Sequence, residues 1–120
     1  MALLGAHRIE VRPVAGRVVV RMDGEVLADT RDALVLEEGR LPARWYVPEA
    51  DVRAERLEPS DHTSHCPFKG DAVYRSARVG DRVEEAVAWS YPQPKSRVAE
   101  IAGRWAFYQD RVDVEVDDSA

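Results

Sequence analysis

The residues best suited to chemistry gather in the segment Ser60–Gly70, which holds two histidines, the single cysteine and one of the two lysines of the chain. A nearby ammonium or imidazolium favours the thiolate form of a cysteine, so Cys66 could act as a nucleophile or redox group. A free cysteine is also commonly a small buried apolar residue. The segment therefore predicts a reactive cluster, with a buried Cys66 as the alternative.

Lysine usage singles out Lys69. The chain has 15 arginines and two lysines, so it nearly always uses arginine where only a positive charge is needed. The compact ammonium of Lys69 suits a phosphate, a carboxylate or a reactive carbonyl. Lys95, in a loop bounded by prolines, has no comparable neighbours, which leaves chance as the alternative for Lys69.

Acidic partners for such a cluster are Glu37, Glu38 and Asp51. Glu37 follows Ala33 and Val35 at a spacing of two residues, so in a regular strand it shares their apolar face and its carboxylate would point inward and need a donor. A carboxyl in an apolar site can act as a general acid or base. The predicted catalytic set is Cys66, Lys69, Glu37 and Asp51.

Metal binding is not expected. His62, His65 and Cys66 form a His-x-x-His-Cys string of residue types that bind zinc. Adjacent side chains point apart in extended backbone, however, and no second pair of ligands follows. The sequence also lacks a glycine-rich phosphate loop, a His-Glu-x-x-His motif and a Gly-x-Ser-x-Gly motif. We therefore predict neither a metal nor a cofactor.

Composition limits the class of protein. The 120 residues suggest one domain, and 45% hydrophobic with 32% charged residues indicates a folded chain. A net charge of −5 argues against a strongly basic nucleic-acid binder, and one cysteine excludes an internal disulfide. No apolar run approaches the roughly 18 residues of a membrane span. We expect a soluble cytoplasmic protein without nucleic-acid or membrane partners and with a small-molecule ligand possible.

Short segments of period two between glycines and prolines predict a mostly β fold. Hairpins are predicted at Asp23-Gly24 and Gly80-Asp81, and a last strand pair around Gln109-Asp110. The segment Pro59–Gly70 fits no period and is predicted to be a loop. Strands are expected at 8–12, 17–22, 25–29, 33–37, 45–47, 73–79, 82–89, 105–107 and 112–116, and short helices at 49–52 and, with Ser96 as N-cap, 96–102.

Three motifs carry a family resemblance: Trp45-Tyr46-Val47-Pro48, Thr63-Ser64-His65-Cys66-Pro67-Phe68-Lys69-Gly70 and Ala88-Trp89-Ser90-Tyr91-Pro92. With Tyr74, Ile101-Ala102-Gly103 and Ala106-Phe107-Tyr108, they resemble the bacterial and fungal domain of unknown function 427 family from about Val18 to Val116. Phe68 stands where many members carry tyrosine.

The resemblance implies a single β-tent-like domain of antiparallel sheets with one or two short helices. Relatives of this fold often hold zinc with paired cysteines, a site that Cys66 alone cannot form. The family is catalogued as nucleotidyltransferase-like. Its motif falls on the four predicted catalytic residues and on six predicted ligand-binding residues: Tyr46, Thr63, Tyr74, Trp89, Tyr91 and Tyr108.

Three functions remain open at this point. The first is an enzyme that acts on a small anionic substrate, with Lys69 orienting the substrate and Cys66 reacting. The second is a ligand-binding module without catalysis. The third is a structural domain in which Lys69 pairs with a buried Glu37 or Asp51.

Overall fold

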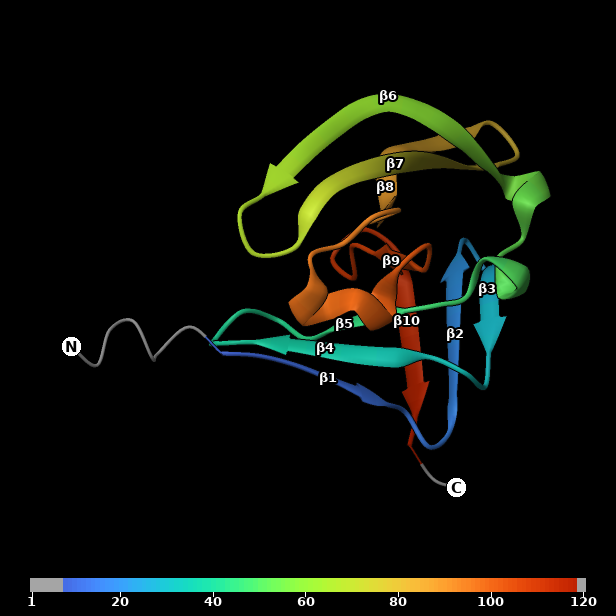
Figure 1. Ribbon diagram of the computed structural model, residues 1–120. Helices are drawn as coiled ribbons and strands as arrows, with labels where there is room; N and C mark the ends of the chain where they lie inside the picture. Colours follow the sequence, from blue (N-terminus) through green and yellow to red (C-terminus); the bar gives the residue numbers. More distant parts are fainter. Residues whose placement is uncertain (1–7, 119–120) are drawn as a thin grey trace.

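The computed structural model describes residues 8–118 and confirms a mostly β chain built from three antiparallel sheets (Figure 1). Two sheets have three strands and the third has four. The first sheet has the order β1-β4-β5, with β1 at Ile9–Pro13, β4 at Leu34–Glu38 and β5 at Arg44–Tyr46. The second sheet has the order β10-β2-β3, with β10 at Asp113–Asp117, β2 at Arg17–Met22 and β3 at Glu25–Thr30. The third sheet has the order β6-β7-β8-β9, with β6 at Leu57–Cys66, β7 at Gly70–Val79, β8 at Arg82–Ser90 and β9 at Trp105–Phe107.

Three short 3-10 helices join these sheets: η1 at Glu49–Asp51, η2 at Ala54–Arg56 and η3 at Ser96–Ile101. In Figure 1, η3 lies between the long arch of β6 and β7 and the strands β1 and β4. Both predicted helical segments are therefore present, although the N-cap of η3 is Lys95 and not the predicted Ser96. Among residues 8–118, no helix has the length and apolar character needed to cross a membrane.

The two predicted hairpins are confirmed. Asp23 and Gly24 connect β2 to β3 with φ values of 51° and 81°. Positive φ at both central residues is the requirement of the tight turn that matches the twist of paired strands. Gly80 and Asp81 form the two-residue connection between β7 and β8, whose flanking residues Val79 and Arg82 are paired.

The predicted pairing of the last two strands is wrong. β9 pairs with β8, whereas β10 pairs with β2 in another sheet. A turn at Tyr108–Arg111 carries the chain from one sheet to the next, with the Arg111 and Val112 N–H groups donating to the Tyr108 carbonyl. Alternating apolar residues predict a strand, but they do not say which strand lies beside it.

The segment predicted to be a loop is largely the strand β6. It forms the edge of the four-stranded sheet, and most of its residues are exposed on both faces. Its register with β7 is interrupted between Ser60 and Thr63. Because neither face is buried, the strand has no apolar alternation, and an edge position tolerates Pro59.

The core consists of three clusters of buried side chains, one of which surrounds the candidate site. We call it the aromatic cluster, and it lies among β4, β5, β7, β8, β9 and η3. Its buried members are Leu36, Tyr46, Ala72, Tyr74, Trp89, Tyr91, Val98, Ile101 and Ala106.

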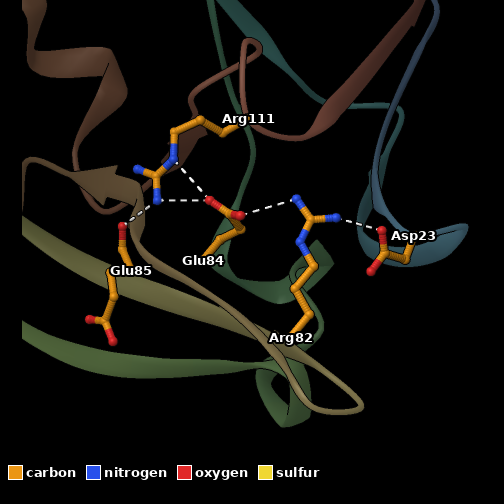
Figure 2. A network of polar contacts seen from close by, with 5 residues as sticks. All are labelled: Asp23, Arg82, Glu84, Glu85 and Arg111. Carbon is orange, nitrogen blue, oxygen red and sulfur yellow. Dashed lines mark hydrogen bonds and ion pairs between the residues drawn. The ribbon is translucent and has the colours of Figure 1, made fainter.

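A chain of charged side chains links two of the sheets (Figure 2). Arg82 donates to Asp23 on the β2–β3 turn at 2.5 Å and to Glu84 on β8 at 3.0 Å. Arg111 donates to the same Glu84 at 3.0 Å and to the Glu85 carbonyl at 2.7 Å. The network fixes the turn before β10 against β8.

Candidate functional site

A hollow of about 200 Å³ opens beside the aromatic cluster, and we call it the Lys69 pocket. Strands β4, β5, β7 and β8 supply six of the eleven lining residues, and the segments after β4, β6, β8 and β9 supply the rest. Its lining residues are Leu36, Glu38, Leu41, Pro42, Arg44, Tyr46, Lys69, Tyr74, Trp89, Tyr91 and Tyr108.

The charged part of this wall is an ion pair between Lys69 and Glu38. The Lys69 Nζ atom lies 2.5 Å from Glu38 Oε1, and the side chains are only 12% and 9% exposed. Lys69 lies on the turn between β6 and β7, where its N–H donates to the Cys66 carbonyl and its own carbonyl accepts from Lys95. The backbone therefore fixes the position from which the ammonium reaches the pocket.

Tyr46 and Trp89 form the buried aromatic floor. The Trp89 Nε1–H donates to the Tyr46 hydroxyl oxygen at 3.1 Å, and the two rings meet edge to face. Burial is the main reason why the pKa of Tyr46 is raised, although the Trp89 hydrogen bond opposes it. Within the described chain, the Tyr46 O–H finds no acceptor.

Tyr91 is a second buried phenol on the pocket wall. Its side chain belongs to the aromatic cluster, the residue is 6% exposed, and its hydroxyl makes no hydrogen bond within residues 8–118. Burial raises the pKa of Tyr91, and the neighbouring Tyr46 and Cys66 raise it further. A buried hydroxyl normally has a hydrogen-bond partner, so this one is available to something in the pocket.

Arg44 places a second cation on the wall. Its guanidinium carbon lies 5.2 Å from the ring centre of Trp89 and 5.5 Å from that of Tyr108. Its Nη1 atom donates to the Gln109 side-chain oxygen at 2.8 Å. Ring faces attract a cation at such distances, so Arg44 is held in place, and among residues 8–118 no carboxylate forms an ion pair with it.

Cys66 lies beside the pocket rather than on its wall. It is a free, partly buried cysteine that packs against the aromatic cluster. The thiol is close enough to influence Tyr46 and Tyr91 electrostatically, yet it does not line the hollow that Lys69 lines. The sequence predicted that Cys66 and Lys69 would line one pocket together, and only Lys69 does so.

The prediction that Glu37 points inward is wrong. Its side chain is 50% exposed and lies 3.4 Å from Arg12. Strand β4 has buried residues on both faces. On one face, Val35 packs in a core cluster that does not include Glu37. On the other face, Leu36 belongs to the aromatic cluster, and the next residue on that face is Glu38. The buried carboxylate is therefore that of Glu38.

Asp51 and Thr63 are also absent from the pocket wall. Asp51 lies on η1 and accepts a hydrogen bond from Thr30 at 2.7 Å. Thr63 is exposed on β6, while its neighbour Ser64 shares a hydrogen bond of 2.9 Å with the Tyr74 hydroxyl. The structure thus brings together Lys69 and five of the six predicted ligand-binding residues: Tyr46, Tyr74, Trp89, Tyr91 and Tyr108.

Sequence reasoning named Glu38 only as a candidate acid, outside the predicted catalytic set, and it missed Arg44. Glu38 could have been chosen over Glu37, because it shares a period of two with Leu34 and Leu36. Arg44 carried no signal, since it is one of 15 arginines. Within residues 8–118, no three His, Cys, Asp or Glu side chains gather as a metal ion would require.

The family follows from a comparison with known sequences. A family model described as a domain of unknown function, DUF427, matches residues 10–118. The chain belongs to the DUF427 family. The DUF427 match spans every residue of the Lys69 pocket, from Leu36 to Tyr108. No curated protein matches the chain, so the DUF427 assignment comes without an activity.

Proposed function

We propose that the Lys69 pocket binds a small anion that carries a flat apolar group, and that it holds this ligand without reacting with it. The observation that carries the proposal is a surplus of donors in one hollow. Tyr46 and Tyr91 each present a buried O–H without an acceptor in the described chain. A buried donor left unpaired costs about 1–3 kcal/mol, which an accepting ligand would recover.

The charges on the wall favour an anion. Lys69 and Arg44 contribute two positive charges and Glu38 contributes one negative charge. Only one of the three ammonium protons of Lys69 is needed for Glu38, so the others can reach a ligand oxygen. Hydrogen bonds between ionised partners are stronger than neutral ones, and a carboxylate could accept from Lys69 and a phenol together.

The size and the apolar surface of the pocket limit the rest of the ligand. Its volume of about 200 Å³ lies below the roughly 300–1,000 Å³ typical of sites for drug-sized molecules. Leu36, Leu41 and Pro42 supply apolar contacts, and the rings of Trp89 and Tyr108 supply flat ones. A small ring with one carboxylate, such as benzoate, fits this combination.

Binding is preferred over catalysis because of where Cys66 lies. A covalent mechanism needs the nucleophile within reach of the bound ligand, and the Cys66 thiol does not line the hollow. The proposal therefore gives Cys66 a packing role and assigns recognition to Lys69, Arg44, Tyr46 and Tyr91.

The proposal can be tested by a substitution at Tyr91, whose hydroxyl has no acceptor among the described residues. Tyr91→Phe should raise the free energy of unfolding, because an unpaired buried hydroxyl is removed, and should weaken benzoate binding by roughly tenfold. The matched control, Tyr74→Phe, loses the hydrogen bond with Ser64 and should lower stability instead. Urea unfolding measures the change in stability, and calorimetric titration with benzoate, and with benzyl alcohol as its neutral analogue, measures the change in binding.

Two outcomes would contradict the proposal. One is the absence of saturable benzoate binding to the wild-type protein. The other is equal affinity for benzoate and benzyl alcohol, because the cations would then contribute nothing. Cys66→Ser should bind benzoate like the wild type, and a loss of binding in that variant would restore a direct role for the thiol.

A further inference from the structure

A second and larger hollow, of about 530 Å³, shares Tyr74 and Tyr108 with the Lys69 pocket. We call it the Glu85 hollow. It lies where β6, β7 and β8 meet the turn before β10. Its lining residues are Ser60, His62, Tyr74, Glu85, Ala86, Tyr108, Asp110 and Arg111.

Irregular backbone borders this hollow on two strands. The register of β6 and β7 shifts between Ser60 and Thr63, which places His62 in the irregular stretch, and that of β7 and β8 shifts between Arg75 and Ala77. Opposite the second shift, Ala86 has a φ of 50°, and its N–H donates to the Ser76 hydroxyl. Strain of this kind at a non-glycine residue costs about 1–3 kcal/mol and gathers at functional sites.

The formal charge of the wall is negative. Figure 2 shows Arg111 turned toward Glu84, which also accepts from Arg82, while the carboxylate of Glu85 points away from this network. Arg82 in turn donates to Asp23, so the two arginines are matched by two carboxylates. Among residues 8–118, the Glu85 carboxylate has one weak polar contact, a hydrogen bond of 3.4 Å that it accepts from the Ser76 hydroxyl.

Asp110 adds a second uncompensated carboxylate. It is exposed, and its side chain makes no hydrogen bond or ion pair with the described residues. Glu85, Asp110 and Arg111 give the lining residues a formal charge of −1. The Arg111 guanidinium is in addition paired with Glu84, which lies outside the lining. The negative sign of the lining is opposite to that of the Lys69 pocket.

Three rings complete the wall. His62 packs against Tyr74 with ring centres 4.4 Å apart, and Tyr108 lies between the two hollows. Burial, and after it the interaction with Tyr74, raises the pKa of Tyr108, so its ring stays neutral at ordinary pH. The Tyr108 ring already has the guanidinium carbons of Arg44 and Arg111 at 5.5 Å and 5.9 Å from its centre, so attraction of a bound ammonium depends on the carboxylates of Glu85 and Asp110 rather than on this ring.

The geometry points to a second binding site in the Glu85 hollow, one that takes a small organic cation such as an aromatic amine. Glu85 and Asp110 face the ammonium, and Tyr74, Tyr108 and His62 contact the ring. This site does not depend on the anion proposed for the Lys69 pocket, although the shared wall of Tyr74 and Tyr108 couples the two.

Benzylammonium is a suitable probe, with benzyl alcohol as its neutral analogue. The experiment follows backbone amide resonances during titration at about pH 8, where histidine is ordinarily neutral. Saturable shifts are expected at Ala86 and Asp110. The double variant Glu85→Gln/Asp110→Asn should bind benzylammonium more weakly by roughly threefold or more, while Glu100→Gln on η3, whose exposed carboxylate does not line the hollow, should bind it like the wild type.

The proposal is overturned if benzylammonium produces no saturable shift, or if it binds no better than benzyl alcohol. It is also overturned if the double variant keeps full affinity or if the shifts map to another surface. Loss of benzoate binding alone would leave this site standing, and loss of benzylammonium binding alone would leave the Lys69 pocket standing, so the two proposals fail separately.

Discussion

The Lys69 ammonium lies 2.5 Å from the Glu38 carboxylate although the two residues are 31 positions apart in the chain. The pair joins the turn after β6 to the end of β4, two elements of different sheets. Its placement on the wall of a hollow, rather than in sealed core, keeps the remaining protons of the ammonium accessible.

Breaking this pair should destabilise the fold. Lys69→Met or Glu38→Gln leaves one charged or polar partner without its counterpart, and each is expected to lower the free energy of unfolding by up to about 3–5 kcal/mol. The double variant Lys69→Met/Glu38→Gln should recover much of this loss but should not bind benzoate. Urea unfolding and calorimetry measure the two effects, and a double variant that binds normally would remove Lys69 from the proposed site.

Glu49 should contribute to the loss of folding stability at acidic pH. Hydrogen bonds from Arg75, and secondarily from Trp105, hold the pKa of Glu49 below its ordinary 4.5 against the opposing effect of burial. A lowered folded-state pKa stabilises the fold above 4.5 and loses this stabilisation as the pH falls through the folded value. Between about pH 6 and pH 3, Glu49→Gln should therefore lose less stability than the wild type.

The control for this prediction is Glu55→Gln, which changes an exposed carboxylate on η2. It should show the same pH dependence as the wild type. A Glu49→Gln protein with an unchanged acid profile would mean that the Arg75 and Trp105 contacts do not favour the charged carboxylate.

Tyr46 and Tyr91 should resist ionisation in alkaline solution. Burial raises the pKa of both hydroxyls, so the folded state favours their neutral forms and loses this advantage as the pH rises through the folded values. An absorbance titration should show these two phenols ionising together with unfolding. Normal titration in a folded protein, assigned with Tyr46→Phe and Tyr91→Phe, would show that both are open to water.

Gly70 should tolerate a side chain less well than Gly24. Gly70 has a φ of 116°, and an added Cβ would lie 3.3 Å from the Gln93 carbonyl oxygen, whereas nothing lies within 4 Å at Gly24, where φ is 81°. Gly24→Ala should cost about 1–2 kcal/mol from backbone strain alone, and Gly70→Ala should cost more. Equal unfolding midpoints for the two variants would contradict the close approach of the β6–β7 turn to the chain at Gln93.

Ala86 should be one position where glycine stabilises the protein. Glycine removes the strain of the φ of 50°, about 1–2 kcal/mol, and loses about 0.4–1 kcal/mol to the freer unfolded chain. Ala86→Gly should therefore raise the free energy of unfolding slightly. Ala88→Gly, a fully buried position in the same strand, should lower it by about 1–2 kcal/mol, and a loss of similar size at Ala86 would argue against strain there.

Local patterns predicted much of the fold. The spacing of Val18, Val20 and Met22 marked β2, and Asp23-Gly24 marked its turn, because both signals depend on neighbouring residues alone. β6 was hidden because an edge strand exposed on both faces needs no apolar pattern. The partners of β9 and β10 were not predictable because the choice between sheets depends on packing across the whole chain.

Part of the site was also predictable from residue types and local motifs. Lys69, Tyr46 and Trp89 were found through their residue types and the family motifs. Glu37 was chosen over Glu38 because the sequence does not say that both faces of β4 are buried, or where each buried face ends. Arg44 enters the site only through the close approach of β5, β8 and the turn after β9.

The side-chain N–H resonance of Trp89 tests the central claim most directly, because this group donates to the Tyr46 hydroxyl on the floor of the Lys69 pocket. Trp105, whose N–H donates to Glu49 away from the pocket, is the internal reference. Titration with benzoate should move the Trp89 resonance saturably and leave that of Trp105 in place. A Trp89 resonance that stays fixed at saturating benzoate, or that moves equally with benzyl alcohol, would contradict an anion site in this pocket.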